Sequence, residues 1–235
     1  MGGLFVTGTD TGVGKTFVAS GLARILSDRG LRVGVMKPVE TGCARRGDEL
    51  EPSDALQLLE AAGSRQEVQR VCPYRFDAPL APDVAARRAG QRIDPALIRE
   101  RFRAIAESFD FVVVEGAGGL LVPIWERYTM ASLAADLGLP LLVVVASRLG
   151  AVNHTLLTLA HARSCGLSVA AYVLNQLSRD RDEAMTTNAE LLARSTDARC
   201  AGVVAYEPAA GQTTAETAAA AVGQAIDVDD LLAGL

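Results

Sequence analysis

GTDTGVGKT, residues 8–16, follows the apolar run Leu4–Val6 and precedes a helical pattern from Phe17 to Arg29. The glycines allow consecutive backbone N–H groups and the start of the helix to face phosphate oxygens. The lysine of such a loop reaches the β and γ phosphates, and the threonine hydroxyl binds Mg²⁺. One more residue separates the two outer glycines than in the common GxxxxGK(S/T) pattern. The combination of strand, glycines, Gly-Lys-Thr and helix nevertheless predicts a phosphate-binding P-loop.

Short, almost entirely apolar runs recur along the chain and alternate with helical patterns. Continuous hydrophobicity indicates strands buried on both faces, as in a parallel sheet. Asp94 opens a helical pattern that ends at Phe109, and Thr129 opens another that Gly138 closes. We therefore predict a single P-loop α/β domain over residues 1–235, with a doubly wound, mostly parallel sheet and helices on both faces. The expected strands are Leu4–Val6, Val33–Met36, Phe111–Val114, Leu141–Val145, Val169–Leu174 and Val203–Ala205.

Two longer stretches show no clear element, namely Pro38–Pro52 and the proline-containing Cys72–Pro82. Loops of this length in a compact domain tend to be functional. The tail after Tyr206 is rich in alanine, glycine and threonine and only weakly patterned, so we assign it no role.

The composition is that of a compact globular protein, with 49% hydrophobic and 22% charged residues. The 23 basic residues are interleaved with 28 acidic ones and the net charge is -5, which argues against nucleic acid and anionic membranes as partners. No apolar run approaches the ~18 residues that a membrane span needs. Without a basic leader or closely spaced cysteines, we expect a cytoplasmic protein with reduced thiols and no zinc site. The cysteines are Cys43, Cys72, Cys165 and Cys200.

Lysine is rare in this chain, because 21 of the 23 basic residues are arginine and the lysines are Lys15 and Lys37. Lys15 belongs to the P-loop, and Lys37 follows the second expected strand. A lysine at a strand end is commonly a solvated surface residue. Ligands of doubly wound folds, however, bind beyond the carboxyl ends of the strands, so both ammonium groups are expected at one crevice. There they can stabilise charge on a transferring phosphoryl group or an oxyanion, and we predict both as catalytic residues.

Two carboxylates are candidates for the metal site of the P-loop. Glu115 follows the apolar run Phe111–Val114 and is the expected acidic partner that holds Mg²⁺, directly or through water. The alternative is a glutamate that caps a loop. Asp54 precedes a helical pattern and fits either a helix N-cap or a second metal ligand. The sequence does not separate these two roles.

Two further strand ends carry polar residues. Ser147–Asn153 leads into a helix whose first N–H groups can receive a substrate carboxylate. His154 and His161 lie on that helix without a third ligand nearby, which favours packing or solvent exposure over metal binding. Asn175 directly follows a strand and fits either recognition of an adenine edge or a turn.

Five segments together resemble the dethiobiotin synthetase family. The resemblance extends in order over residues 3 to about 206. The P-loop alone is unspecific, but the lysine motif and the segments after the later strands make the combination specific. The segments are GTDTGVGKT (8–16), KPVETG (37–42), VEGAGGLLVP (114–123), LGAVNHTLLT (149–158) and VLN (173–175).

This resemblance implies a homodimeric ATP-dependent ligase that requires Mg²⁺. Its members convert 7,8-diaminononanoate, CO₂ and ATP into dethiobiotin, ADP and phosphate through a carbamate and a carbamic–phosphoric anhydride. The resemblance also implies that Lys15 and Lys37 balance the charge of the carbamate and γ-phosphate, and that Thr41 contacts the substrate. It places Mg²⁺ on Thr16, Asp54 and Glu115.

The same resemblance implies which residues bind the nucleotide and the substrate. Gly150, Ala151, Val152 and Asn153 would hold the substrate carboxylate across the dimer interface. The nucleotide residues would be Gly12, Val13, Gly14, Lys15, Thr16, Phe17, Asp54, Glu115, Gly116, Ala117, Gly118, Asn175, Gln176, Val204, Ala205 and Tyr206.

The sequence departs from the family in one loop, where Ala81-Pro82-Asp83 replaces the common Ser-Pro-His. A partitioning-type ATPase switch is an alternative of the same fold, but it places a lysine where this chain has Asp10. It would also use a basic surface or membrane helix, whereas the C-terminal segment Asp227–Leu232 is acidic. A cobyrinate-type amide ligase would need an ammonia source, for which 235 residues leave little room.

Overall fold

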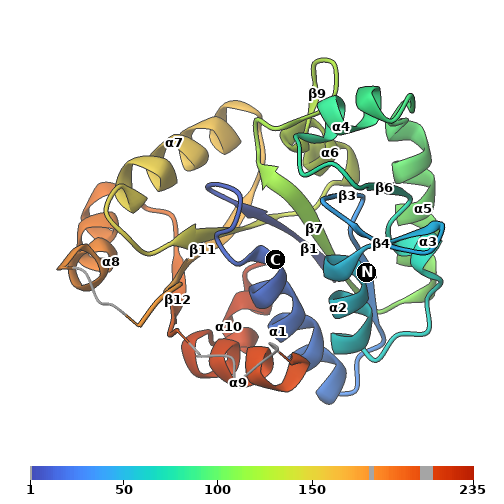
Figure 1. Cartoon of the computed structure of the whole chain (residues 1–235). Helices are drawn as coiled ribbons and strands as arrows, with labels where there is room; N and C mark the ends of the chain where they lie inside the picture. The colour runs from blue at the N-terminus through green and yellow to red at the C-terminus, as the bar shows by residue number, and fades with distance from the viewer. Residues whose placement is uncertain (1, 180–182, 207–213) are drawn as a thin grey trace.

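A six-stranded parallel sheet forms the centre of the computed structural model, which describes residues 2–179, 183–206 and 214–235 (Figure 1). The strand order is β12-β11-β10-β1-β7-β2, and each pair of neighbours is parallel. The sequence-based prediction of a parallel α/β fold is therefore confirmed. The strands are β1 (Gly2–Gly8), β2 (Val33–Met36), β7 (Phe111–Gly119), β10 (Leu141–Ala146), β11 (Val169–Asn175) and β12 (Cys200–Val204).

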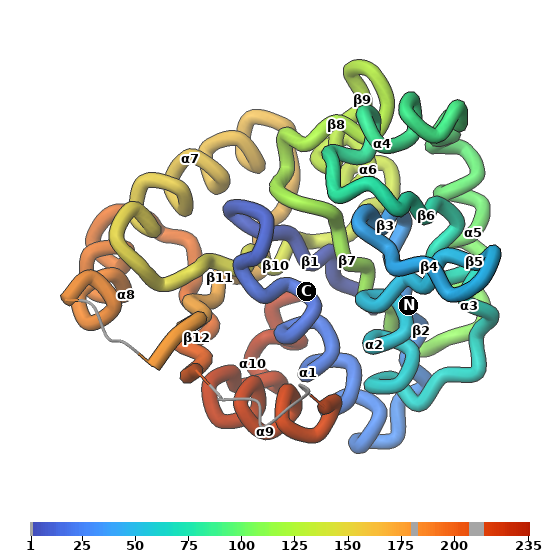
Figure 2. The backbone as a smooth tube through the Cα atoms, viewed as in Figure 1, coloured from blue at the N-terminus to red at the C-terminus, as the bar shows by residue number. Residues whose placement is uncertain are grey.

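Helices cover both faces of the sheet, and each face has its own apolar core. Figure 2 shows α1, α9 and α10 together below the sheet, and α2 shares their core. The helices on this face are α1 (Lys15–Asp28), α2 (Ser53–Ala61), α3 (Val68–Val71), α9 (Ala215–Ala225) and α10 (Val228–Ala233). Those of the other core are α4 (Pro82–Arg88), α5 (Pro95–Ser108), α6 (Met130–Leu137), α7 (Ala151–Ser164) and α8 (Glu183–Ser195).

Alternate side chains of one strand enter opposite cores. In β1, Leu4 and Val6 pack against α1 and its neighbours, whereas Phe5 packs on the other face. Because both faces are covered, each position of the strand must be apolar, which explains the continuous runs in the sequence.

Several helix ends follow the sequence signals. The Thr129 side chain accepts a hydrogen bond from the Ser132 N–H at 3.3 Å and caps α6, and Gly138 ends this helix at φ 64°. Asp94 caps α5 by accepting from the Ala96 N–H at 2.8 Å. The helix boundaries predicted at these positions are confirmed to within one residue.

The two stretches expected to lack regular structure contain short strands, so that expectation was wrong. The first holds β3 (Val39–Thr41) and the antiparallel pair β4 (Ala44–Arg46) and β5 (Glu49–Glu51). The second holds β6 (Tyr74–Phe76), which pairs in parallel with β3. Strands of three residues are too short to show a hydrophobic period.

The remaining described elements lie after β7 and at the C-terminus. β8 (Pro123–Trp125) and β9 (Tyr128–Thr129) form an antiparallel hairpin. The weakly patterned tail contains α9 and α10 in its described part, and both contribute to the core on the α1 side. Within the described ranges, no helix combines the length and apolar character that a membrane crossing requires.

Candidate active site

The P-loop connects β1 to the first residue of α1. Gly12 and Gly14 adopt φ values of 73° and 87°, which favour glycine. A Cβ atom at position 14 would lie only 2.1 Å from Nδ2 of Asn175, so glycine is also required by space. No side chain caps α1 at Gly14, in keeping with a helix start that faces an anion.

Lys15 is buried inside this loop. Its Nζ atom donates a hydrogen bond to the Asp10 carbonyl oxygen at 3.0 Å. The pKa of Lys15 is lowered to about 8, mainly by burial and then by the nearby Lys37 ammonium, although Glu115 and Asp54 oppose these effects. An anion that binds beside Lys15 would therefore stabilise the charged, ammonium form of this side chain.

Lys37 lies between two carboxylates at the carboxyl ends of the strands. Its Nζ atom is 2.7 Å from Oδ2 of Asp54 and 2.5 Å from Oε1 of Glu115. The same Glu115 oxygen accepts the hydroxyl of Thr16 at 2.9 Å. β7 lies between β1 and β2 in the sheet. This order brings residues from distant parts of the chain into one group, the lysine cluster, which consists of Thr16, Lys37, Asp54 and Glu115.

The charges of this cluster depend on one another. Burial acts to lower the pKa of Lys37, but Glu115 and Asp54 outweigh it and raise the pKa above its usual value. Burial raises the pKa of Glu115, while Lys37 acts in the opposite direction. The Lys37 side chain is 4% exposed, so its ammonium is charged largely because these carboxylates face it.

The structure resolves the alternatives for Asp54 and Glu115 in part. Pro52 occupies the N-cap of α2. Asp54 lies within the first turn of this helix, and its side chain accepts a hydrogen bond from Lys37. Asp54 is therefore not the N-cap residue. Glu115 lies inside β7 rather than in a loop, which removes its loop-capping alternative. Metal binding by either carboxylate stays a prediction.

A pocket of about 310 Å³ contains this cluster. It brings together most residues predicted around the phosphates with Thr41, which was predicted for the substrate, and adds Thr11, Val39 and Glu40, which were not predicted. Its lining residues are Thr11, Gly12, Gly14, Lys15, Thr16, Lys37, Val39, Glu40, Thr41, Asp54, Glu115, Ala117 and Gly118.

A smaller pocket of about 160 Å³ adjoins the P-loop at Gly14. Asn175 lies here and donates from Nδ2 to the Val13 carbonyl at 2.9 Å, so part of its amide holds the P-loop. Val204 is buried and is not among the lining residues. The lining comprises Gly14, Phe17, Asn175, Gln176, Leu177, Ala205 and Tyr206, of which Leu177 was not predicted.

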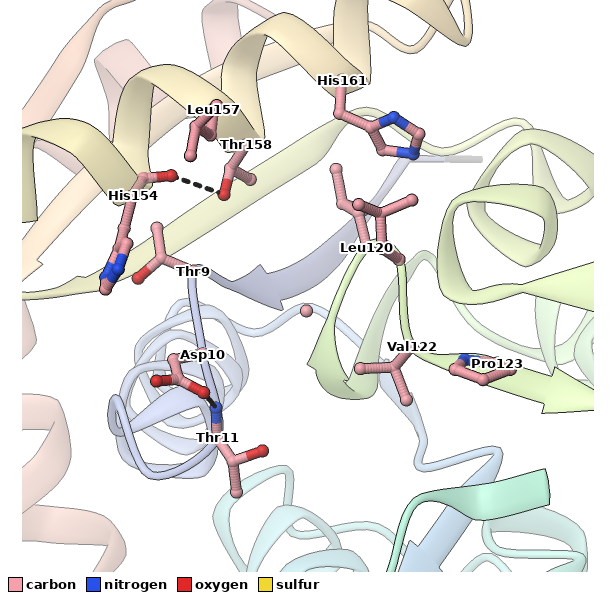
Figure 3. A pocket seen from close by; sticks show the side chains of 12 residues that line it. Thr9, Asp10, Thr11, Leu120, Val122, Pro123, His154, Leu157, Thr158 and His161 are labelled. Atoms are coloured by element: carbon pink, nitrogen blue, oxygen red, sulfur yellow. Dashed lines mark hydrogen bonds between the residues drawn. The ribbon is translucent and has the colours of Figure 1, made fainter. Parts of the chain in front are cut away.

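A third pocket of about 430 Å³ lies on the other side of the P-loop, between residues 119–123 and α7 (Figure 3). His154 and His161 line it, together with the exposed Leu121 and Leu157. Figure 3 shows the two imidazoles well separated along α7. This apolar wall was not foreseen, because an exposed leucine on a helix carries no signal in one sequence.

The predicted substrate-carboxylate residues form the beginning of α7. Gly150 is the N-cap at φ 93°, and no side chain caps the helix there. Residues 150–153 line none of the three pockets described above. In one chain these residues are therefore not part of the pocket that contains Lys15 and Lys37, and their role stays a prediction.

The departure at Asp83 has a structural explanation. Asp83 forms an ion pair with Arg87 at 3.0 Å and accepts the Glu126 N–H at 3.1 Å, so it joins α4 to the β8–β9 hairpin. Arg87 in turn lies 4.5 Å over the ring of Trp125. Asp83 does not line the pocket of the lysine cluster.

The donor atoms of the cluster fit Mg²⁺ bound through a nucleotide. Oε2 of Glu115 is buried without a hydrogen-bond partner in the described part of the chain, and the other candidate metal ligands, Thr16 and Asp54, also offer oxygen atoms. No group of three His, Cys, Asp or Glu side chains converges as a metal cage among the described residues. This composition matches Mg²⁺, which is held by one or two carboxylates plus phosphates rather than by a protein cage.

The parallel sheet, the P-loop and the lysine cluster define a P-loop nucleotide-binding protein. A family model described as an AAA domain matches residues 2–214. The chain is 48% identical over 208 residues to the ATP-dependent dethiobiotin synthetase BioD of Anaeromyxobacter dehalogenans strain 2CP-C, covering 88% of this chain and 92% of the relative. It is 37% identical to that of Bacillus subtilis strain 168, covering 92% and 91%. The chain belongs to the family of ATP-dependent dethiobiotin synthetases.

Solved structures of other proteins share the fold. The MinC:MinD cell division complex of Aquifex aeolicus gives a TM-score of 0.60 at 15% identity, covering 98% of this chain and 94% of the other. A ParA family ATPase of Chlorobium tepidum gives 0.57 at 12% identity, covering 94% and 92%. These likenesses confirm the predicted P-loop fold. The relatives named dethiobiotin synthetase support the prediction of an ATP-dependent ligase and not the alternative of a partitioning-type ATPase switch.

Proposed function

We propose that this ATP-dependent ligase converts 7,8-diaminononanoate, CO₂ and ATP into dethiobiotin, ADP and phosphate. The observation that carries the proposal is the convergence of Lys15, Lys37 and Glu115 on one pocket of a chain in this family. Two buried cations beside a phosphate loop suit a reaction in which every intermediate is an anion.

The proposed chemistry has three bond-forming steps. CO₂ adds to one amine of the substrate and forms the N–C bond of a carbamate, as the amine loses a proton. A carbamate oxygen then attacks the γ-phosphorus, and the bond to ADP breaks. The second amine attacks the carbonyl carbon of the resulting carbamic–phosphoric anhydride and loses a proton, so that the ureido ring closes as the bond to phosphate breaks and phosphate leaves.

The chain's own residues bind the reactants and balance their charge. Lys15 exchanges its contact with the Asp10 carbonyl for the β and γ phosphates. Lys37 exchanges Asp54 and Glu115 for the carbamate and the transferring phosphoryl group. Thr41 lines the same pocket and is assigned to the substrate. Holding both reactants against fixed cations lowers the barrier by orientation and by preorganised charge.

Thr16, Asp54 and Glu115 are the residues that would hold Mg²⁺. When bound, this ion neutralises charge on the β and γ phosphates. Oε2 of Glu115 has no hydrogen-bond partner among the described residues, which supports this assignment, since a buried carboxylate oxygen without a donor is otherwise costly.

The adenosine is assigned to the smaller pocket beside Gly14. Gln176, Ala205 and Tyr206 line it, and Phe17 supplies an apolar side chain. Asn175 links this pocket to the P-loop through the Val13 carbonyl.

The substrate carboxylate is assigned to Gly150–Asn153 of a second subunit. In one chain these residues line none of the pockets near the phosphates, and the uncapped start of α7 offers backbone N–H groups to an anion. A homodimer that joins α7 of one subunit to the lysine pocket of the other satisfies both facts. We place this dimer in the cytoplasm.

The decisive assay measures phosphate release by the purified protein with ATP and Mg²⁺, adding 7,8-diaminononanoate and bicarbonate separately and together. A ligase releases phosphate only when both are present and yields dethiobiotin, detected by mass spectrometry, in equal amount. The matched control is Lys15→Ala, in which turnover should fall ~10²-fold or more. Phosphate release that ignores the diamine would contradict the proposal and favour an ATPase switch.

A further inference from the structure

Glu40 is a buried carboxylate that lines the pocket of the lysine cluster, and the roles assigned so far do not use it. Its side chain belongs to β3 and the residue is 4% exposed. Oε1 accepts hydrogen bonds from the Asp54 N–H at 3.0 Å and the Ser53 hydroxyl at 3.3 Å. Oε2 accepts the Ala55 N–H at 3.1 Å. Both oxygens therefore serve the first turn of α2.

The beginning of α2 needs such an acceptor. Its N-cap residue is Pro52, which provides no side-chain hydrogen bond. Helix starts leave backbone N–H groups unpaired, and a carboxylate satisfies them and complements the helix dipole. A buried carboxyl group costs free energy unless its oxygens are hydrogen-bonded, and a local Ser or Asp at the N-cap would suffice for the stability of α2 alone.

Glu40 also links Asp54 to the chain segment that carries Lys37. Residues 37–40 form one short segment, which begins with the ammonium of Lys37 and ends with Glu40. Glu40 accepts a hydrogen bond from the backbone N–H of Asp54, while the side chain of Asp54 contacts Lys37 at 2.7 Å. The Asp54 side chain is 37% exposed, so packing alone does not fix it.

We propose that Glu40 is the positioning residue for Asp54, because it holds the first turn of α2 so that the Asp54 carboxylate faces Lys37 and the phosphate pocket. Both carboxylate oxygens of Glu40 are engaged by the first turn of α2, so the proposal gives Glu40 no contact with the reacting atoms. The inference rests on the proposed function only through the use of this pocket for Mg²⁺ and ATP.

The charge-removing variant Glu40→Gln keeps the volume but turns one acceptor into an NH₂ group that faces N–H donors. Asp54 then loses its fixed orientation. Outer partners of metal ligands typically change affinity by ~10-fold or more, and we expect a rise of about 10-fold in the Kd for Mg·ATP and in the half-saturating Mg²⁺ concentration.

A double-mutant cycle tests this role by calorimetric binding of Mg·ATP without any diamine. The proteins are wild type, Glu40→Gln, Asp54→Asn and the double variant. Because Glu40 acts through Asp54, the double variant should bind no more weakly than Asp54→Asn alone. The proposal would be overturned if Glu40→Gln raised the Kd for Mg·ATP by the same factor in wild type and in Asp54→Asn. It would also be overturned if a folded Glu40→Gln protein showed no change in this Kd.

Two further variants separate positioning from stability. Asp94→Ala removes the carboxylate cap of α5, which lies outside the lysine pocket, and should lower Tm while leaving the Kd for Mg·ATP unchanged. If Glu40→Gln does not fold, the cycle is run in a Pro52→Ser background, which supplies a local cap to α2. Since binding is measured without diamine, a wild type that makes no dethiobiotin would refute the proposed reaction but not this inference.

Discussion

The Nζ atom of Lys37 and the Oε1 atom of Glu115 lie 2.5 Å apart in a pocket that also contains the P-loop. Both side chains are almost fully buried, so each depends on the other for charge compensation. The ammonium occupies one side of the carboxylate that we assign to Mg²⁺. Lys37 is therefore an internal counterion of the free protein, and ligands must replace its contacts.

This relationship predicts competition between Lys37 and a divalent cation. Without nucleotide, Lys37→Met should bind Mg²⁺ or Mn²⁺ more tightly than wild type, because the two carboxylates lose their internal counterion. Calorimetry or Mn²⁺ paramagnetic resonance measures the affinity directly. Unchanged affinity in a folded Lys37→Met protein would show that the ammonium does not occupy the cation's place.

Lys37→Arg tests whether geometry matters beyond charge. The variant should fold and bind ATP through the intact Lys15 loop, yet lose about 10²-fold in single-turnover product formation, because a planar guanidinium misplaces the reactants. Thermal melts and ATP titration serve as controls. Retention of most activity would mean that positive charge alone is sufficient at this position.

Glu115→Gln should raise the half-saturating Mg²⁺ concentration by about 10-fold or more, since an amide is a poorer ligand for a hard cation than a carboxylate. Mg²⁺ titration of phosphate release gives the value. Glu190→Gln, which removes a surface partner of Arg194, is the matched control and should leave the titration unchanged. If Glu115→Gln had the same half-saturating Mg²⁺ concentration as wild type, Glu115 would have only a structural role.

ATP binding should take up a proton at Lys15 above pH 8. The pKa of Lys15 is about 8 in the free protein, and bound phosphates stabilise the ammonium form. Below pH 8 the residue is charged in both states, so affinity changes little there. Above pH 8 the free lysine loses its proton and ATP affinity should fall as pH rises. Calorimetry at pH 8.5 in buffers of different ionisation enthalpy measures the uptake, which Lys15→Ala should abolish.

Alanine substitutions at Gly12 and Gly14 can be compared to test the close approach of Asn175 to Gly14. Both have positive φ, so each alanine variant carries about 1–2 kcal/mol of backbone strain. A Cβ at Gly12 meets nothing within 4 Å, whereas one at Gly14 meets Asn175. Urea unfolding should therefore show a further loss of ~1–3 kcal/mol for Gly14→Ala, part of which Gly14→Ala/Asn175→Ala recovers. Equal losses for the two single variants would contradict the clash.

Much of the site could be predicted because its residues follow apolar runs. Lys37 comes directly after β2, and the rule that ligands bind at the carboxyl ends of strands placed it beside the P-loop. Glu115 was found by the same rule, although β7 continues past it to Gly119. Local patterns thus identified the members of the cluster but not their contacts.

The support of Asp54 could not be predicted from local patterns. Glu40 caps α2 from a strand of three residues, and nothing in the sequence around Asp54 signals an acceptor that arrives from 14 positions earlier. Likewise, Asn175 contacts the Val13 carbonyl only because β11 and the P-loop end at the same edge of the fold. Such contacts depend on chain topology, whereas sequence periodicity reports burial alone.

The order of strands has a consequence for synthesis of the chain. β1 and β2 are separated by α1 and are complete by Met36, but they do not pair, because β7 lies between them. A nascent chain that has not yet released residues 111–119 from the ribosome lacks the strand that lies between β1 and β2. During that interval the two lysines have no Glu115 to face, and the exposed edges of β1 and β2 are open to pairing with other chains.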